Sequence, residues 1–291
     1  MSILVNEATR VLVQGITGRS GSLQTKSLLD FGTRVVAGVT PGKGGQEVCG
    51  VPVFDFVDDA VRAAGGVDAA ISFVPPLNAR DAAIEAMDCG IRLLVLTMEG
   101  IPKRDVLEIL SCARFRGARV LGPGTAGLIA PGKCKLGAHP TRMFIPGGVG
   151  IVSKSGALSY EIGKTLTEAG IGQSTVVALG GGPIWGMTQK DALALFNEDE
   201  ETKAIVLLGE IGGNTEIDAA EYIARTPVKK PVVSLIVGRS APEGKSLGHA
   251  GAIIRGGKGT ARSKAEALER AGVKMAATPA EVVARLRELR L

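Results

Sequence analysis

The chain has 291 residues, of which 45% are hydrophobic and 22% charged, a balance typical of a globular protein with about two domains. The small net charge of +5 and the 3% aromatic content argue against nucleic acid, because single-strand binders need aromatic stacking platforms. No apolar run predicts a membrane span, and no leader pattern begins the chain, so we expect a cytoplasmic protein. A cleaved organelle transit peptide would leave the same sequence. Four widely spaced cysteines predict neither a disulfide nor a metal site.

The first half of the chain alternates short β-branched runs with helical patterns. Strands are expected at 11–14, 34–39, 69–74, 93–96 and 118–121, and helices at 18–31, 77–88 and 102–115. This rhythm is typical of parallel βαβ units. It predicts an α/β fold that begins with a Rossmann-like doubly wound sheet.

Turn residues interrupt the pattern between about 122 and 147, and a second α/β series follows. Its strands are expected at 149–153, 175–179, 204–208 and 232–237, and its helices at 156–169, 188–196, 216–225, 262–271 and 279–290. We therefore expect a first domain over residues 1–125, a connecting segment over 126–147 and a second domain over 148–291.

A glycine-rich loop follows the first strand, where Gly15-Ile16-Thr17-Gly18-Arg19-Ser20-Gly21 leads into a helix. This spacing lets a pyrophosphate approach the helix N-terminus, although the same turn also serves simple strand–helix packing. NAD-binding domains usually place an acidic residue after the second strand, whereas this chain has Lys43 in a glycine loop there. The lysine favours a ligand with an additional phosphate, such as NADP or coenzyme A.

His249, one of two histidines, lies between glycines in Leu247-Gly248-His249-Ala250-Gly251-Ala252-Ile253-Ile254. Glycines leave room for a bulky ligand, and a mostly neutral imidazole is nucleophilic. A structural loop histidine is the simpler interpretation, but Arg239, Lys245, Arg255 and Lys258 nearby favour an anion.

Two further strand ends carry polar groups. Ser153-Lys154-Ser155-Gly156 opens a helix whose N–H groups suit a phosphate, although either serine could be an ordinary N-cap. Glu210, after the 204–208 strand, is expected at the same sheet edge, where its carboxylate could orient the imidazole of His249. A surface glutamate is the alternative.

These motifs resemble those of succinyl-CoA synthetase α subunits, and the resemblance runs nearly end to end. The matching segments are Pro41-Gly42-Lys43-Gly44-Gly45, Ser153-Lys154-Ser155-Gly156, Gly209-Glu210-Ile211-Gly212-Gly213 and Gly248-His249-Ala250-Gly251-Ala252-Ile253-Ile254. The resemblance implies a CoA-binding Rossmann-like domain followed by a flavodoxin-like ligase domain with a phosphohistidine loop. It also implies an ATP-grasp β subunit that binds ATP or GTP with Mg, in an αβ or α2β2 assembly.

The resemblance also implies roles for single residues. His249 would be the phosphorylated residue and Glu210 its partner, while Ser155 and Gly156 would hold the phosphate. Tyr160 would lie beside the substrate and the partner subunit. The positions that would line coenzyme A are Thr17, Gly18, Arg19, Ser20, Lys43, Thr97, Met98 and Glu99. No metal site is expected on this chain itself.

The sequence departs from the family pattern at several positions, the segment His139-Pro140-Thr141-Arg142 among them. Gly124 and Thr125 stand where the family has asparagine and cysteine, and Gly182 replaces an aspartate. We expect the α subunit of an acid–CoA ligase of the tricarboxylic acid cycle, with succinate the leading acid. A ligase for malate or citrate, a non-catalytic CoA-binding regulatory subunit and an NADP oxidoreductase are the alternatives.

Overall fold

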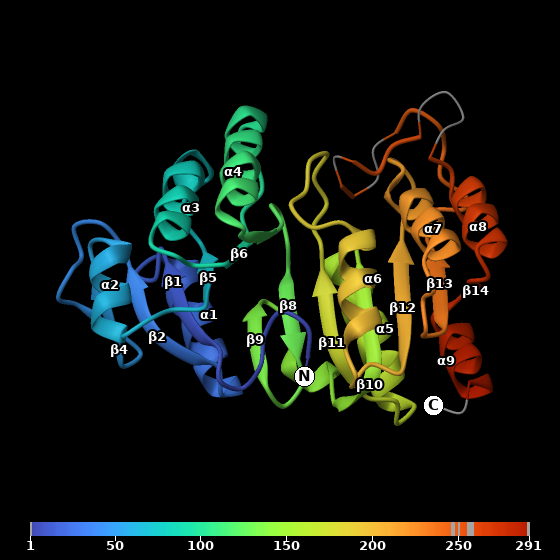
Figure 1. The fold of residues 1–291 in the computed structure, drawn as a ribbon, viewed down its shortest axis with the longest axis horizontal. Helices are drawn as coiled ribbons and strands as arrows, with labels where there is room; N and C mark the ends of the chain where they lie inside the picture. Colours follow the sequence, from blue (N-terminus) through green and yellow to red (C-terminus); the bar gives the residue numbers. More distant parts are fainter. Residues whose placement is uncertain (1, 246–247, 250, 255–258, 290–291) are drawn as a thin grey trace. The chain divides into compact units, whose positions relative to one another are not determined.

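The computed structural model describes residues 2–245, 248–249, 251–254 and 259–289. The chain divides into two compact units (Figure 1). We call them the N-terminal unit, which comprises residues 4–139 and 184–186, and the C-terminal unit, whose described residues fall within 1–3, 140–183 and 187–291.

The first sheet has the strand order of a Rossmann fold. Its strands are β1 (Arg10–Gln14), β2 (Arg34–Val39), β3 (Glu47–Val48), β4 (Val51–Phe54), β5 (Ala69–Ser72), β6 (Leu93–Leu96) and β7 (Arg119–Leu121). They are arranged β3-β4-β2-β1-β5-β6-β7, and all pairings are parallel except β3 with β4. From β4 to β7 this is the Rossmann order, which reverses between β1 and β5 and leaves a crevice at their carboxyl ends.

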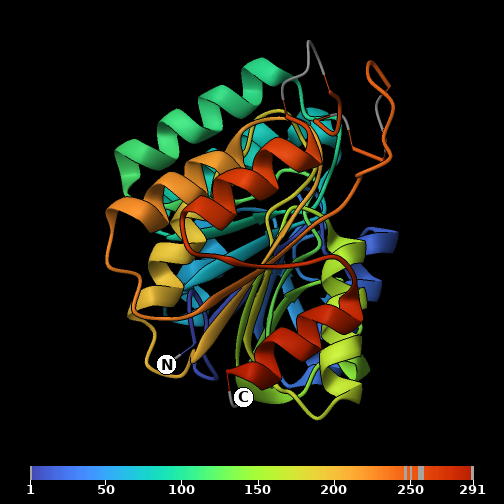
Figure 2. The ribbon, with the colours of Figure 1, turned by 90° about the vertical axis from the view of Figure 1, so that its right-hand side faces the viewer.

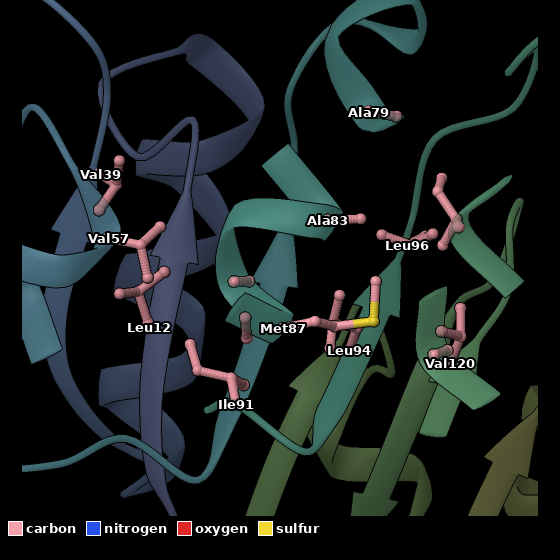
Figure 3. Close-up of a cluster of buried hydrophobic side chains, with 14 of the residues drawn as sticks. Leu12, Val39, Val57, Ala79, Ala83, Met87, Ile91, Leu94, Leu96 and Val120 are labelled. Atoms are coloured by element: carbon pink, nitrogen blue, oxygen red, sulfur yellow. The ribbon is translucent and has the colours of Figure 1, made fainter. Parts of the chain in front are cut away.

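One buried apolar cluster joins this sheet to three helices. The helices of the N-terminal unit are α1 (Arg19–Phe31), α2 (Val57–Ala64), α3 (Ala79–Asp88) and α4 (Lys103–Arg116), with a 3₁₀ turn η1 (Pro76–Asn78) before α3. Leu12 and Leu94 from the strands face Val57 of α2 and Ala83 and Met87 of α3 (Figure 3). The small Ala83 lets α3 approach the sheet closely, so the strand ends that carry the ligand loops are held on a close-packed core.

The second sheet has a flavodoxin-like order. Its strands are β8 (Gly127–Ala130), β9 (Cys134–Gly137), β10 (Pro146–Ser153), β11 (Gln173–Ala178), β12 (Ala204–Gly209), β13 (Val232–Ile236) and β14 (Lys274–Ala276). They are arranged β14-β13-β12-β10-β11-β8-β9, with β8 and β9 antiparallel to each other. From β11 to β14 the order is that of flavodoxin, which reverses at β10 and β12.

Helices cover both faces of the strands β10–β14. They are α5 (Gly156–Glu168), α6 (Gln189–Glu198), α7 (Thr215–Arg225), α8 (Ala261–Arg270) and α9 (Pro279–Glu288), and a 3₁₀ turn η2 (Thr141–Met143) precedes β10. Figure 2 shows α5 and α9 side by side on one face and α6, α7 and α8 on the other. Because both faces are covered, most residues of these strands are apolar, as is usual for parallel strands. Ser153 at the end of β10 and Glu210 directly after β12 place polar groups at the carboxyl edge of this sheet.

The elements expected from the sequence are present, with ends shifted by a few residues, except that residue 290 lies outside the described residues. The expected doubly wound and flavodoxin-like sheets are confirmed. The structure adds β3, β4, α2, β8, β9 and β14. The strands β8 and β9 lie within 126–147, the segment expected to be a connection. There, a Cβ on Gly127 would lie 1.9 Å from the Leu136 carbonyl oxygen, so this glycine serves close packing within a hairpin.

Candidate active site

Glu210 and His249 are in direct contact. Both carboxylate oxygens of Glu210 lie 3.0 Å from Nδ1 of His249. Glu210 follows β12 immediately and its side chain is 9% exposed, whereas the imidazole is 24% exposed. A carboxylate at Nδ1 holds the ring proton of the neutral imidazole on that nitrogen, so the lone pair is on Nε2. The arrangement therefore makes Nε2 the nucleophilic atom of a partly accessible histidine.

Gly181 brings the loop after β11 against the imidazole. A Cβ on Gly181 would lie 2.4 Å from Cδ2 of His249, so a side chain at this position would displace the ring. The N–H of Gly251 also donates to the carbonyl of Gly181 at 3.4 Å. Gly182, one of the departures from the family pattern, belongs to this loop, and its carbonyl oxygen would lie 3.1 Å from a Cβ on Gly251.

Gly212 is the point where three loops meet. Its carbonyl accepts a hydrogen bond from Lys154 Nζ at 3.3 Å, and its N–H donates to Gly259 at 2.8 Å. A Cβ on Gly212 would lie 2.0 Å from the carbonyl oxygen of Gly251. The loops after β10 and β12 and the histidine loop therefore converge at the carboxyl edge of the sheet, as predicted for Ser155, Glu210 and His249.

Helix α5 begins at Gly156, directly after Ser155, as the sequence predicted. Ser155 is its N-cap, and its hydroxyl accepts the N–H of Leu158 at 3.3 Å. Ser153 accepts the N–H of Ser155 at 3.1 Å and donates to its carbonyl at 2.7 Å, which fixes the approach to Gly156. Helix starts of this kind favour anions, because their first N–H groups have no acceptor within the helix. One turn further on lies Tyr160, where burial raises the pKa of the phenol.

The expected basic surroundings of His249 are described only in part. Arg239 and Lys245 are exposed. Ala250, Arg255 and Lys258 lie outside the described residues.

The N-terminal unit contains a cavity of about 590 Å³ at the carboxyl ends of β1, β2 and β5. This is the crevice where a doubly wound sheet binds ligands. It is lined by Gln14, Gly15, Val39, Thr40, Pro41, Asp55, Phe56, Val74, Pro75, Asn78, Asp81, Ala82 and Glu85. No ligand motif of the sequence contains Asp55, Asp81 or Glu85, so these residues were not predicted to line a site. Their carboxylates suit the hydroxyl and amino groups of a nucleoside rather than its phosphates.

Two of the residues expected to bind coenzyme A hydrogen-bond to the cavity wall, although none of the eight is part of its lining. The N–H of Thr17 donates to Thr40 Oγ1 at 3.4 Å. The N–H groups of Lys43 and Gly44 both donate to Asp55 Oδ1 at 2.9 Å, so Asp55 fixes the glycine loop that presents the lysine.

The other positions expected to bind coenzyme A lie at two further chain segments. Gly18 is the N-cap of α1, and Arg19 and Ser20 are exposed in its first turn. Thr97, Met98 and Glu99 follow β6, and Thr97 Oγ1 donates to the Ser72 carbonyl at 2.7 Å.

Gly124 lies against the segment after β6. Its N–H donates to the Met98 carbonyl at 2.9 Å, and a Cβ on Gly124 would lie 3.1 Å from Cγ of Glu99. The hydroxyl of its neighbour Thr125 accepts the N–H of Gly127 at 2.8 Å. The departures at 124 and 125 therefore lie beside residues expected to contact coenzyme A.

Within the described part of the chain, no group of three or more His, Cys, Asp or Glu side chains could hold a metal ion. None of the helices described is both long and apolar enough to span a membrane.

Comparisons with known proteins agree with the two units. The CoA binding domain family matches residues 6–100, and the CoA-ligase family matches residues 152–274. A succinate–CoA ligase [ADP-forming] subunit alpha 2 from Archaeoglobus fulgidus is 52% identical over 289 residues, which are 99% of this chain and 100% of the relative. The corresponding subunit from Aquifex aeolicus is 50% identical over 97% of this chain and 92% of its own length.

Among solved structures, ATP citrate lyase from Methanothrix soehngenii in complex with citrate and coenzyme A has a TM-score of 0.90 and 25% sequence identity. The match covers 99% of this chain and 51% of the lyase chain, so this chain spans about half of that protein.

Proposed function

The chain belongs to the family of succinate–CoA ligase α subunits, and we propose that it is the α subunit of an NDP-forming acid–CoA ligase with His249 as its phosphorylated residue. The observation that carries this proposal is the contact between the Glu210 carboxylate and Nδ1 of His249. It directs the lone pair of the ring to Nε2, the atom that would take up the phosphoryl group. Succinate is the proposed acid, because the relatives named above are succinate–CoA ligases.

In the first step, Nε2 of His249 attacks the γ-phosphorus of ATP or GTP. A nitrogen–phosphorus bond forms, and the bond to the departing nucleoside diphosphate breaks. The phosphorylated ring carries a positive charge shared by both nitrogens, and the Glu210 carboxylate at Nδ1 stabilises it. The start of α5 at Ser155 and Gly156 then holds the phosphoryl oxygens, because its N–H groups point outward from the positive end of the helix.

In the second step, a carboxylate oxygen of the acid attacks the phosphorus, and the nitrogen–phosphorus bond breaks to return neutral His249. The resulting acyl phosphate is an activated acyl group. Coenzyme A supplies the thiol that replaces its phosphate.

The N-terminal unit is the proposed site for coenzyme A. The cavity at β1, β2 and β5 has room for a nucleoside and offers carboxylates to its donor groups. Lys43, held by Asp55, and Arg19, at the start of α1, would bind phosphates at the surface. The domain boundaries that we propose, 1–125 and 148–291 with a connection between them, assign coenzyme A to the first domain and phosphoryl transfer to the second.

We propose an ATP-grasp β subunit as the partner that holds ATP or GTP with Mg, in an αβ or α2β2 complex. The test is to purify the chain with that subunit and supply nucleotide, coenzyme A and one acid at a time. Succinyl-CoA formation that requires His249 supports the proposal. A higher turnover with malate or citrate would change the acid and keep the mechanism. No phosphate on His249 under any condition would favour a non-catalytic CoA-binding subunit.

A further inference from the structure

Lys264 of α8 is a fully buried cation with three acceptors around its ammonium group. Its Nζ donates to the carbonyl of Glu210 at 2.7 Å, to the carbonyl of Gly212 at 2.5 Å and to Glu216 Oε2 at 2.5 Å. The side chains of Lys264 and Glu216 are both 0% exposed. A lysine ammonium has three protons, so these contacts use all of them.

Glu216 of α7 contacts the backbone N–H of Glu210. Its Oε1 accepts the N–H of Glu210 at 3.3 Å and lies 3.5 Å from Nζ of Lys154. The backbone of Glu210 is therefore held on both sides, at its N–H by Glu216 and at its carbonyl by Lys264. The side chain of Glu210 extends from this fixed backbone and reaches Nδ1 of His249.

A buried ion pair adds little to the free energy of unfolding, because the cost of desolvating two charges offsets most of their electrostatic attraction. Here the ion pair holds the backbone N–H and carbonyl of Glu210, the residue whose carboxylate contacts His249. A carboxylate fixed in advance stabilises developing positive charge on the ring better than a mobile one, since it needs no reorganisation during the reaction.

We propose that Lys264 and Glu216 are positioning residues that hold Glu210 against Nδ1 of His249 and so keep Nε2 as the nucleophile. The inference rests on the proposed role of His249 in phosphoryl transfer. The competing interpretation is a simple structural link, in which the ion pair fastens α7 and α8 to the sheet and has no effect on the imidazole.

Lys154 provides a matched control. It is also a buried lysine that pairs with Glu216 and donates to Gly212, whereas Lys264 donates in addition to the carbonyl of Glu210. We compare Lys264→Met with Lys154→Met, and we add the charge-balanced double variant Lys264→Met/Glu216→Gln in case the single change at 264 prevents folding.

Two readouts are needed, both on the full chain in complex with its β subunit. The first is the single-turnover rate of His249 phosphorylation from ATP, measured at several ATP concentrations. The second is the nitrogen-15 spectrum of the imidazoles in the labelled chain, which reports which ring nitrogen carries the proton. His139 is the only other histidine, so its signal serves as an internal reference.

We expect Lys264→Met to slow phosphorylation about tenfold or more at unchanged ATP affinity. Mutation of the residues that orient metal-binding histidines has effects of about this size. His249 should lose its preference for a proton on Nδ1, while Lys154→Met keeps it. The double variant should remain slow even if its melting temperature recovers. A wild-type tautomer and rate in Lys264→Met, or equal tautomer changes in both lysine variants, would overturn the inference. If wild-type His249 is never phosphorylated, the proposed function fails, while the tautomer comparison still decides this inference.

Discussion

Glu210 meets His249 symmetrically, with both carboxylate oxygens 3.0 Å from Nδ1. This contact joins the strand end after β12 to a glycine-flanked loop 39 residues further along the chain. It favours a proton on Nδ1 and places a negative charge beside a ring that would become positive in the proposed phosphorylation.

Replacement of Glu210 by glutamine should therefore impair phosphorylation of His249 without loss of the fold. The amide removes the charge and can present an N–H to Nδ1, which favours the wrong tautomer. We expect the single-turnover rate with radiolabelled ATP to fall by about 100-fold or more, as when a comparable histidine loses its orienting carboxylate. Coenzyme A affinity, measured by calorimetry, should stay unchanged. A wild-type rate in this variant would show that the carboxylate has no part in phosphoryl transfer.

Gly181→Ala should disturb the same histidine from the opposite loop. The added Cβ would lie 2.4 Å from Cδ2 of His249, so the ring must shift and its contact with Glu210 is disturbed. We expect a loss of phosphorylation comparable to that of the glutamine variant. Gly170→Ala is the control: Gly170 has φ +77° and no atom within 4 Å of an added Cβ, so the change should cost about 1–2 kcal/mol of stability and leave phosphorylation unchanged. Equal phosphorylation in both variants would contradict the close approach at 181.

Lys43 should recognise a phosphate of coenzyme A, and its loop is held by Asp55. We expect Lys43→Met to weaken coenzyme A binding about tenfold to a hundredfold, the range for one charged hydrogen bond, and to bring its affinity close to that of 3′-dephospho-CoA. Asp55→Ala should act in the same direction by releasing the loop. Lys190→Met changes an exposed lysine of the C-terminal unit and serves as the control. A full preference for coenzyme A in Lys43→Met would reject this phosphate contact.

His139 should make the stability of the N-terminal unit sensitive to acid. Burial lowers the pKa of its imidazole to about 3, whereas an unfolded histidine titrates near its ordinary pKa of about 6.5. Below that value the unfolded state binds more protons, so the free energy of unfolding falls as the pH decreases from about 6.5 towards 3. At pH 5 the expected loss is about 2 kcal/mol relative to neutral pH.

Urea unfolding at neutral pH and at about pH 5 measures this loss. His139→Gln should reduce the difference between the two conditions. The same acid sensitivity in this variant and in the wild type would assign it to other groups.

The sequence predicted the parts of the fold that depend on local periodicity. The strands β10 and β12 and the helix α5 follow directly from apolar runs and turn residues. The hairpin β8–β9 was missed because Gly127 indicates a loop when it is read locally, whereas its conformation is required by contact with Leu136 on the facing strand. The short helix α2 was missed because its 8 residues offer too few turns for a clear period.

In the candidate site too, local sequence patterns indicate some residues, whereas others are recognised only from tertiary contacts. Ser155, Glu210 and His249 could be proposed from the sequence because each follows a predicted strand or lies in a glycine-rich loop. Lys264 was missed because it lies on a helix rich in charged residues, where lysine usually faces solvent. Its burial against Glu210 and Glu216 arises from tertiary packing, which no local pattern reveals.

We propose above all that His249 carries the phosphoryl group. The most direct test is mass spectrometry of the chain, purified with its β subunit and incubated with ATP or GTP, followed by addition of succinate and coenzyme A. We expect an acid-labile phosphate on His249 that disappears when succinate and coenzyme A are added, with formation of succinyl-CoA. An unphosphorylated His249, or succinyl-CoA formation by a His249→Gln variant at the wild-type rate, would contradict it.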